Sequence, residues 1–401
     1  YENFGNVGKA TILAVKAAMI LEYGYSGNQL GLEYMKEAQE LDPDHWEWNL
    51  LCGKIISRLR RVEGASTKKP TEEELEYLQK SVELYRGDAS ALVHLANVYR
   101  SISYFIFREK SEAENSQSES VEFRPHVQRG GRMGWSVSWR PQTEEEVNVL
   151  DRWRNPQQIP SVRQIIPLET DQKDYLQLAK NLYLEALKLE PNCPYNNARC
   201  AKGLWSMPKP YRDKDLAKEA ILKAISLAPK DSLVNHYAGL FYEFCYDDEK
   251  ALESYEKSFC DNKCNYPAEI NYINLKLKTS CPGVYSPILH FQNLLLKYLN
   301  PTQTVQTLCH YAFYLYKEQK LYISAIENIV KAIKINPGSQ ILKTFIPGNY
   351  YGHNPQSNNM FDLLEEIILK CKNLPIPNEE DFINETLETV RKFRSEVFDE
   401  N

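Results

Sequence analysis

Apolar and polar positions alternate with a helical period along most of the chain, and several of the apolar segments end at a proline. Four segments show this pattern clearly: GLEYMKEAQELDP, AKNLYLEALKLEP, AKEAILKAISLAP and YISAIENIVKAIKINP. Residues three or four positions apart share one side of a helix, and proline ends a helix because it has no amide hydrogen. The pattern therefore predicts amphipathic helices that end at Pro43, Pro191, Pro229 and Pro337.

These helices share a spacing of small and large residues before the proline. Five positions before it stand Ala38, Ala186, Ala224 and Ala332. Twelve positions before it stand Gly31, Ala179, Ala217 and Ala325, and eight before it stand Met35, Tyr183, Ile221 and Ile329. The small residues let a second helix approach, and the larger residue fills the space between them. The spacing predicts close packing between the helices of a pair.

A second set of apolar segments completes the pairs. Small residues recur in EWNLLCGKII, ALVHLANVY, NNARCAKGLW and LVNHYAGLFY. The sequence predicts helices at 8–24, 28–42, 46–60, 72–86, 89–108, 172–190, 194–207, 213–228, 232–245, 248–260, 266–278, 286–299, 303–318 and 320–335. It also predicts two amphipathic helices within 359–398.

Two antiparallel helices in a unit of about 34 residues are the pattern of the tetratricopeptide repeat. The chain resembles this family over most of its length. The resemblance implies an all-α fold, a right-handed superhelical solenoid in which the first helix of each pair lines the concave face. We expect tetratricopeptide-like helices at 1–108 and 171–345, an irregular insertion at 109–170, and capping helices at 346–401.

The insertion differs in composition from the rest of the chain. It begins with REKSEAENSQSES, which is polar and acidic, and we expect a mobile loop there. The following residues alternate arginine, glycine and tryptophan, which suits an irregular hairpin or an extended arm. Arginine beside tryptophan suits single-stranded nucleic acid. Alternatively, the tryptophans anchor the loop on the solenoid. The residues of this arm are Arg132, Trp135, Trp139 and Arg140.

Overall composition limits the classes of function. The net charge of −6 argues against a protein whose whole surface coats nucleic acid, although a local basic patch remains compatible with it. The nine cysteines have irregular spacing, as expected for reduced thiols in the cytoplasm or nucleus, with the cytoplasm favoured. No segment is apolar enough to cross a membrane. Because the sequence opens on Tyr1, we expect that a preceding segment is missing.

Enzyme motifs fail on inspection. ENFGNVGKAT resembles a phosphate-binding loop, but Asn3 replaces its first glycine and Ala10 replaces the hydroxyl residue that would bind magnesium. Cys260 and Cys264 have no paired cysteine or histidine motif nearby, so we expect no metal. We therefore predict a protein that is not an enzyme and has no cofactor.

The candidate binding residues follow from the register of the repeats. Positions two, five, nine, twelve and thirteen of each unit face inward in this family, and several of them carry cations or hydrogen-bond donors here. Such a groove suits an anionic ligand, although any solenoid has polar inner positions. The candidates are Lys54, Arg58, Asn97, Arg100, Tyr195, Lys202, Trp205 and His236.

Two functions fit these residues. The first is a scaffold or adaptor that binds a protein partner, an extended peptide or a helix, in its concave groove. The second is RNA binding, because the irregular pairs, the long insertion and the helical tail resemble the interferon-induced proteins with tetratricopeptide repeats. That resemblance implies a basic cavity that holds RNA ends. The sequence favours the protein partner, keeps RNA as the alternative, and leads us to expect neither DNA binding nor membrane insertion.

Overall fold

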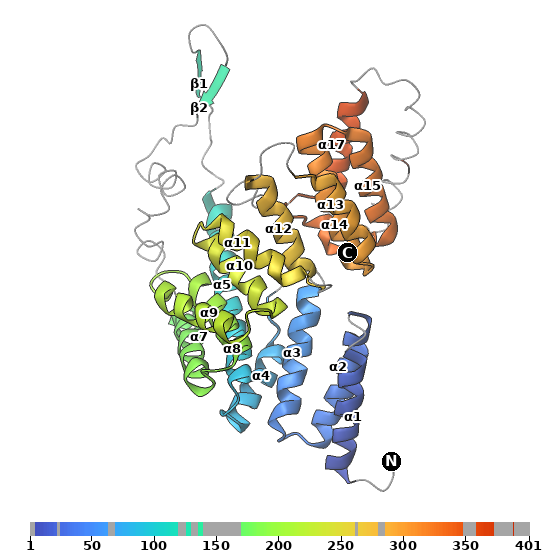
Figure 1. The fold of residues 1–401 in the computed structure, drawn as a ribbon. Coiled ribbons are helices and arrows are strands. Elements are labelled where there is room, and N and C mark those ends of the chain that lie inside the picture. Colours follow the sequence, from blue (N-terminus) through green and yellow to red (C-terminus); the bar gives the residue numbers. More distant parts are fainter. Residues whose placement is uncertain are drawn as a thin grey trace.

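The computed structural model describes residues 5–21, 25–62, 69–118, 126–129, 135–138, 170–260, 264–279, 285–347 and 358–372, together with residue 388. Over these residues the protein is built almost entirely of α-helices, so the predicted all-α solenoid is confirmed. The helices follow one another as antiparallel pairs (Figure 1). Among the described residues, no helix is both long enough and apolar enough to cross a membrane.

The N-terminal helices agree with the predicted pairs. The first pair is α1 (Asn6–Leu21) with α2 (Tyr25–Leu41), and the second is α3 (Trp46–Val62) with α4 (Glu72–Leu84). Thr71 caps α4, because its side chain accepts a hydrogen bond from the amide of Glu74.

The third pair spans the insertion. Its first helix is α5 (Ala89–Ser118) and its second is α7 (Thr170–Leu189), and the two pack along each other. The expected loop at REKSEAENSQSES was wrong in its first part, because α5 continues to Ser118. Glutamate, lysine, alanine and glutamine are good helix formers, and neither glycine nor proline interrupts this part of the chain.

Two regular pairs follow. They are α8 (Pro194–Ser206) with α9 (Lys214–Leu227), and α10 (Ser232–Phe244) with α11 (Asp248–Phe259). Three of these helices begin with an aspartate cap. Asp213, Asp231 and Asp247 each accept a hydrogen bond from the amide three residues further on.

The C-terminal helices are less regular. They are α12 (Tyr266–Thr279), α13 (Pro287–Lys297), α14 (Pro301–Tyr314), α15 (Tyr322–Ile335), α16 (Gln340–Lys343) and α17 (Met360–Lys372). A short π-helix, η3 (Leu315–Gln319), extends α14. The second helix predicted for the tail lies outside the described residues.

Two short strands lie within the insertion. β1 (His126–Arg129) and β2 (Trp135–Ser138) pair in antiparallel fashion, with Arg129 opposite Trp135. They form the hairpin at the top of Figure 1. The division of the chain into repeat, insertion and capping regions stays a prediction.

The small and large residues of the repeat interlock as the sequence predicts. All the alanines at the two small positions are fully buried, and so are Met35, Tyr183, Ile221 and Ile329. Gly203 faces the ring of Tyr183, and Gly239 faces the ring of Tyr255. A Cβ atom at either glycine would overlap that ring, so the glycines permit the close approach of the paired helices.

A buried asparagine closes several of the turns that follow the helix-ending prolines. The side-chain amide of Asn197 donates to the carbonyl oxygen of Pro191 at 3.0 Å and to that of Cys193 at 2.7 Å. Asn49 and Asn235 make the same two contacts in their own turns. Each asparagine side chain therefore supplies a donor to the carbonyl of the helix-ending proline. It also adds a second donor to a carbonyl that already accepts from the backbone amide of the same asparagine.

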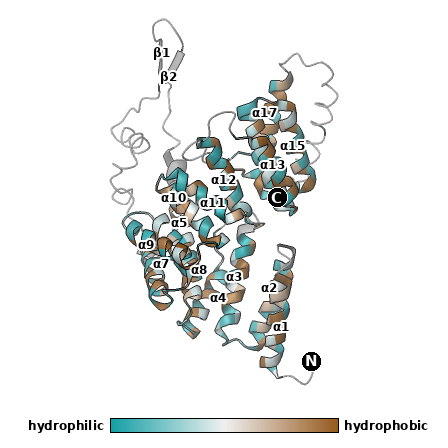
Figure 2. Ribbon diagram, viewed as in Figure 1, coloured by the Kyte–Doolittle hydropathy of each residue, from teal (hydrophilic) through white to brown (hydrophobic). Residues whose placement is uncertain are grey.

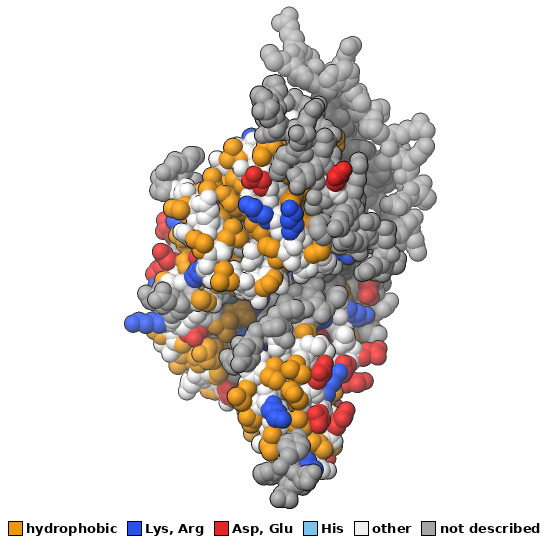
Figure 3. Space-filling model, turned by 90° about the vertical axis from the view of Figure 1, so that its right-hand side faces the viewer, with side chains coloured by type: hydrophobic (Ala, Val, Ile, Leu, Met, Phe, Trp, Pro, Cys, Tyr) orange, Lys and Arg blue, Asp and Glu red, His pale blue; other side chains and the backbone are white. Residues whose placement is uncertain are grey.

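The solenoid curves so that its two ends lie on the same side of the molecule. The chain starts at α1 and α2, crosses to the opposite side of the molecule at helices α7–α9, and returns with helices α13–α17 (Figure 1). Apolar stripes alternate with polar ones around each helix (Figure 2), as expected for helices that bury only one side. Figure 3 shows hydrophobic side chains over both end groups of helices, and on α1 the exposed ones include Val7, Val15 and Met19.

Candidate ligand-binding face

The first helices of successive pairs form a continuous layer. Helix α5 packs on α8, α8 packs on α10, and α10 contacts α12. The candidate residues lie on first helices of pairs: on α5, α8 and α10 of this layer, and on α3 of the second pair. We call the surface that carries Arg100, Lys202 and His236 the inner face. Lys54 and Arg58 of α3 are assigned to it by the repeat register.

Arg100 links α5 to α8 on this face. Its guanidinium donates to the hydroxyl of Ser206 at 2.8 Å, and the half-buried side chain also lies beside the Tyr183 hydroxyl. The Nε atom of Arg100 is buried and has no hydrogen-bond partner. One edge of this guanidinium therefore helps to hold α5 against α8.

Asn97 lies one turn before Arg100 and serves the packing of its own pair. Its side-chain amide donates to the carbonyl oxygen of Val93 at 2.8 Å, and its side-chain oxygen accepts a hydrogen bond from Tyr183 at 2.8 Å. Both ends of the side chain are thus occupied. Asn97 positions Tyr183, the large residue of the repeat motif.

Lys202, His236 and Asn271 come together from α8, α10 and α12. The Lys202 ammonium lies over the ring of Tyr237, 5.4 Å from its centre. Next along α10, the Nε2 atom of His236 shares a hydrogen bond of 3.3 Å with the side-chain amide of Asn271. The layer of first helices therefore places a cation, an aromatic ring and an imidazole side by side.

The imidazole of His236 is neutral at physiological pH. Burial lowers the pKa of His236 to about 4, and the nearby charge of Lys202 acts in the same direction. A neutral imidazole beside the Asn271 amide is one donor and one acceptor, and it adds no charge to the face. The positive charge here comes from Lys202.

Lys54 and Arg58 lie one helical turn apart on α3. Burial lowers the pKa of Lys54, and the charge of Arg199 adds to this effect, while Asp88 and Glu47 oppose it. Arg58 is exposed. The surroundings of Lys54 on α3 therefore combine cations with the carboxylates of Asp88 and Glu47.

The two aromatic candidates on α8 differ in environment. Tyr195 is exposed, and its hydroxyl donates to Asp231 at 3.0 Å, next to the start of α10. Trp205 is buried, with 5% of its surface accessible, and its ring centre lies 5.3 Å from that of Phe241. It also stacks on Phe244. Trp205 therefore contributes to packing between α8 and α10.

The arm contributes little to the described site. Trp135 begins β2, opposite Arg129. Arg132, Trp139 and Arg140 lie outside the described residues. The role of the arm in binding stays a prediction.

Several residues of this face were not among the candidates from the sequence. Tyr237 could have been found, because it follows His236 directly and precedes the small pair of the α10 repeat. Asn271 could not, because α12 has no helix-ending proline motif that would set its register. Arg199 was missed because the register places it beside the inner positions and not at one of them.

Among the residues that the structure describes, no group of three or more His, Cys, Asp and Glu side chains could hold a metal ion. The buried thiols of Cys52, Cys200 and Cys309 have raised pKa values because burial disfavours the thiolate. They are therefore poor nucleophiles and suit a packing role.

The paired helices, the interlocking small residues and the layer of first helices define a superhelical solenoid of the tetratricopeptide-repeat type. Solved structures with a similar fold include human IFIT1, as a dimer with m7Gppp-AAAA, at a TM-score of 0.56 and 15% sequence identity. That match covers 96% of this chain and 72% of the IFIT1 chain. The human IFIT1 dimer with PPP-AAAA gives a TM-score of 0.54 at 15% identity and covers 97% and 72% of the two chains.

A thermophilic tetratricopeptide-repeat protein of Thermus thermophilus, TTC0263, matches with a TM-score of 0.43 and 11% identity, over 67% of this chain and 99% of that one. No protein-family model matches the sequence, and no curated protein matches it significantly. At these identities the likeness to solved structures defines the fold alone.

Proposed function

We propose that this protein is a non-enzymatic binding scaffold whose inner face holds single-stranded RNA. The observation that carries the proposal is the Lys202 ammonium over the Tyr237 ring, with Arg100 on the neighbouring first helix α5. The repeat register adds Arg58 of α3 to the same face. Cations track phosphates, and aromatic rings stack on bases. The sequence alone favoured a protein partner.

The fold comparison moves the preference to RNA. The two human IFIT1 structures hold m7Gppp-AAAA and PPP-AAAA, and their fold matches nearly the whole of this chain. A likeness over the full solenoid, including its irregular C-terminal helices, supports a related use of the inner face. The net charge of −6 is compatible with this, because RNA binding here needs only a local cationic surface.

The proposal is tested with purified protein and short RNAs that carry a fluorophore at the 3′ end. We use PPP-AAAA, m7Gppp-AAAA and AAAA with a 5′-hydroxyl, and measure anisotropy at low and at physiological salt. We expect binding that weakens as salt rises, because phosphate contacts release counterions. If none of the RNAs binds even at low salt, the RNA proposal is wrong.

An extended peptide is the second candidate ligand. The carboxylates of Glu47 and Asp88 lie close enough to Lys54 to raise its pKa. Glu243 of α10 adds a further carboxylate, which accepts a hydrogen bond from the Tyr255 hydroxyl of α11. A face with both signs of charge fits a peptide better than a phosphate backbone. Peptide binding would be established instead if the protein binds none of the RNAs and retains a protein partner after nuclease treatment.

A further inference from the structure

Helix α12 belongs to two separate apolar cores. Ala268 and Leu275 pack with Ala251 and Tyr255 of α11. The other side of α12 joins the core of the C-terminal helices, through Tyr266, Ile270 and Ile273. Since α13 to α17 share that one core, they form a body that meets the rest of the solenoid at α12.

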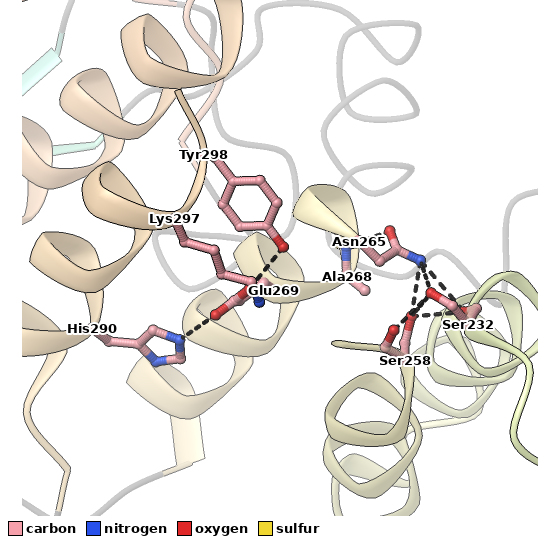
Figure 4. Close-up of polar contacts among 8 residues, drawn as sticks. All are labelled: Ser232, Ser258, Asn265, Ala268, Glu269, His290, Lys297 and Tyr298. Atoms are coloured by element: carbon pink, nitrogen blue, oxygen red, sulfur yellow. Dashed lines mark hydrogen bonds and ion pairs between the residues drawn. The ribbon is translucent and has the colours of Figure 1, made fainter. Parts of the chain in front are cut away.

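A buried carboxylate lies at this junction. Glu269 is on α12, and only 6% of its surface is accessible. It accepts hydrogen bonds from His290 Nε2 at 3.2 Å, Lys297 Nζ at 2.7 Å and the Tyr298 hydroxyl at 2.9 Å (Figure 4). All these donors belong to α13 or to the residue that caps its end. The carboxylate therefore connects α12 with the C-terminal body.

The donors are held in place by contacts of their own. His290 Nδ1 shares a hydrogen bond of 2.8 Å with the hydroxyl of Tyr285, and its ring lies 5.9 Å from that of Tyr272. The Lys297 ammonium lies 5.6 Å from the centre of the Phe259 ring of α11. A carboxylate deprived of these donors would be left buried without compensation, which is costly.

At the start of α12, neutral groups form the contact with α10 and α11. Asn265, one turn before Glu269, donates to the hydroxyls of Ser258 at 2.9 Å and Ser232 at 3.1 Å. Ser258 in turn donates to the carbonyl oxygen of Ser232 at 2.7 Å. Figure 4 shows the two networks on either side of α12. The attachment of α12 to α13 thus depends on the Glu269 carboxylate, whereas its attachment to α11 combines hydroxyl and amide groups with an ion pair between Lys278 and Asp248 at 2.9 Å.

We propose that the ionised Glu269 is a latch that holds the helices α13 to α17 against α12, and that loss of its charge releases them as one body. The movement changes the distance between these helices and α1–α2, which lie on the same side of the molecule (Figure 1). Glu269→Gln breaks the latch because it removes the charge and replaces one acceptor oxygen with a donor nitrogen. If this nitrogen faces Lys297, it meets an ammonium that cannot accept a hydrogen bond. This conformational device is independent of the ligand of the inner face.

The latch is tested on the full chain with Glu269→Gln, by hydrogen exchange and small-angle X-ray scattering. We expect amide protection in α13 and at the start of α12 to fall by about tenfold or more, since the substitution removes charged hydrogen bonds across the junction. Protection in α8 and α9 should stay at the wild-type level. The radius of gyration should increase as the C-terminal body moves.

Glu366→Gln is the control for loss of a paired carboxylate outside the junction. Glu366 accepts hydrogen bonds from the Tyr316 hydroxyl at 2.6 Å and Lys370 Nζ at 2.8 Å, so it shares a tyrosine and a lysine partner with Glu269, on a more exposed side chain. These contacts lie inside the C-terminal body, between α17 and η3. The control variant should keep the wild-type radius of gyration and the wild-type protection at the start of α12.

Two results would overturn the proposal. The first is a Glu269→Gln protein whose hydrogen exchange and radius of gyration equal those of the wild-type protein. The second is an equal loss of protection and an equal increase in radius of gyration in Glu269→Gln and Glu366→Gln. If Glu269→Gln does not fold, Tyr298→Phe removes a single donor and keeps the charge pair with Lys297. We expect a smaller loss of protection in the same helices, and wild-type exchange of α13 in that variant would contradict the latch.

Discussion

Single residues set the distance between the two helices of a pair. Gly203 and Gly239 leave room for the rings of Tyr183 and Tyr255, and the alanines of the second helices are buried at the same contacts. A side chain larger than hydrogen at these glycines would force the rings or the helices to move. Packing at this density explains why the same sizes recur at the same spacing.

Replacing Gly239 with alanine tests this packing. Alanine favours a helix over glycine by about 0.5–1 kcal/mol, but overlap in a packed interface costs about 1–3 kcal/mol. We expect a net decrease in the free energy of unfolding, measured by urea denaturation. The control is Gly338→Ala, where the nearest atom to an added Cβ is the Asn336 side-chain oxygen at 3.9 Å. Equal stability of wild-type protein and Gly239→Ala would contradict the packing role.

The recurrent asparagine is a second feature at the residue scale. Asn235 donates to the carbonyl oxygens of Pro229 and Asp231, and it is buried. Replacing Asn235 with alanine removes the side-chain donor to the Pro229 carbonyl, whereas the Asp231 carbonyl keeps the backbone amide of residue 235. We expect stability to fall by about 1–2 kcal/mol. The exposed Asn293 of α13 provides the control substitution, which should change stability little. A decrease of the same size at both sites would count against the role of Asn235.

At the scale of elements, the sequence predicted the helices well, α12 and α13 included, but not the side-chain contacts that join α12 to α13. Pro43, Pro191 and Pro229 end helices whose small and large residues repeat, so the pairs could be recognised from spacing alone. Helices α12 and α13 have no such marker. Glu269 stands among apolar residues in the sequence, and its partners on α13 come more than twenty residues later. No periodicity links residues across such a distance.

The Glu269 network predicts a dependence of stability on pH. Burial acts to raise the pKa of Glu269, but hydrogen bonds from His290, Lys297 and Tyr298 outweigh it and hold the pKa below the ordinary value of 4.5. The carboxylate binds protons more weakly in the folded than in the unfolded chain. Its contribution to stability is therefore present above the unfolded pKa and is lost as the pH falls through the folded pKa.

This dependence is measured by comparing wild-type protein with Glu269→Gln. We expect the wild-type protein to be more stable at neutral pH, with a difference that shrinks as the pH falls through the acid range below 4.5. Glutamine does not titrate, so the change in the difference reports on this carboxylate. A difference that stays constant from neutral to acid pH would show that the charge of Glu269 does not stabilise the fold.

At the scale of the molecule, stacking of the first helices creates the inner face. Lys202 and His236 are far apart in sequence from Asn271, yet α8, α10 and α12 bring them together. The repeat register predicted that such residues share a side of the solenoid. It could not show that Trp205 is buried against Phe241 and Phe244, because those rings come from the neighbouring helix. Position along one helix does not reveal what the next helix supplies.

The salt dependence of RNA binding after charge reversal on the inner face tests the central claim most directly. The variant is Lys202→Glu, and the control is Lys223→Glu, which reverses an exposed lysine on α9, a second helix. Affinity for 3′-labelled PPP-AAAA is measured by anisotropy at several salt concentrations, and thermal unfolding confirms that both variants are folded.

We expect Lys202→Glu to bind more weakly at low salt, with a slope of log affinity against log salt reduced by about 0.7 for each RNA phosphate that the variant no longer neutralises. Lys223→Glu should retain the affinity and slope of the wild-type protein. Wild-type binding by a folded Lys202→Glu protein, or equal weakening in both variants, would contradict the assignment of RNA binding to the inner face.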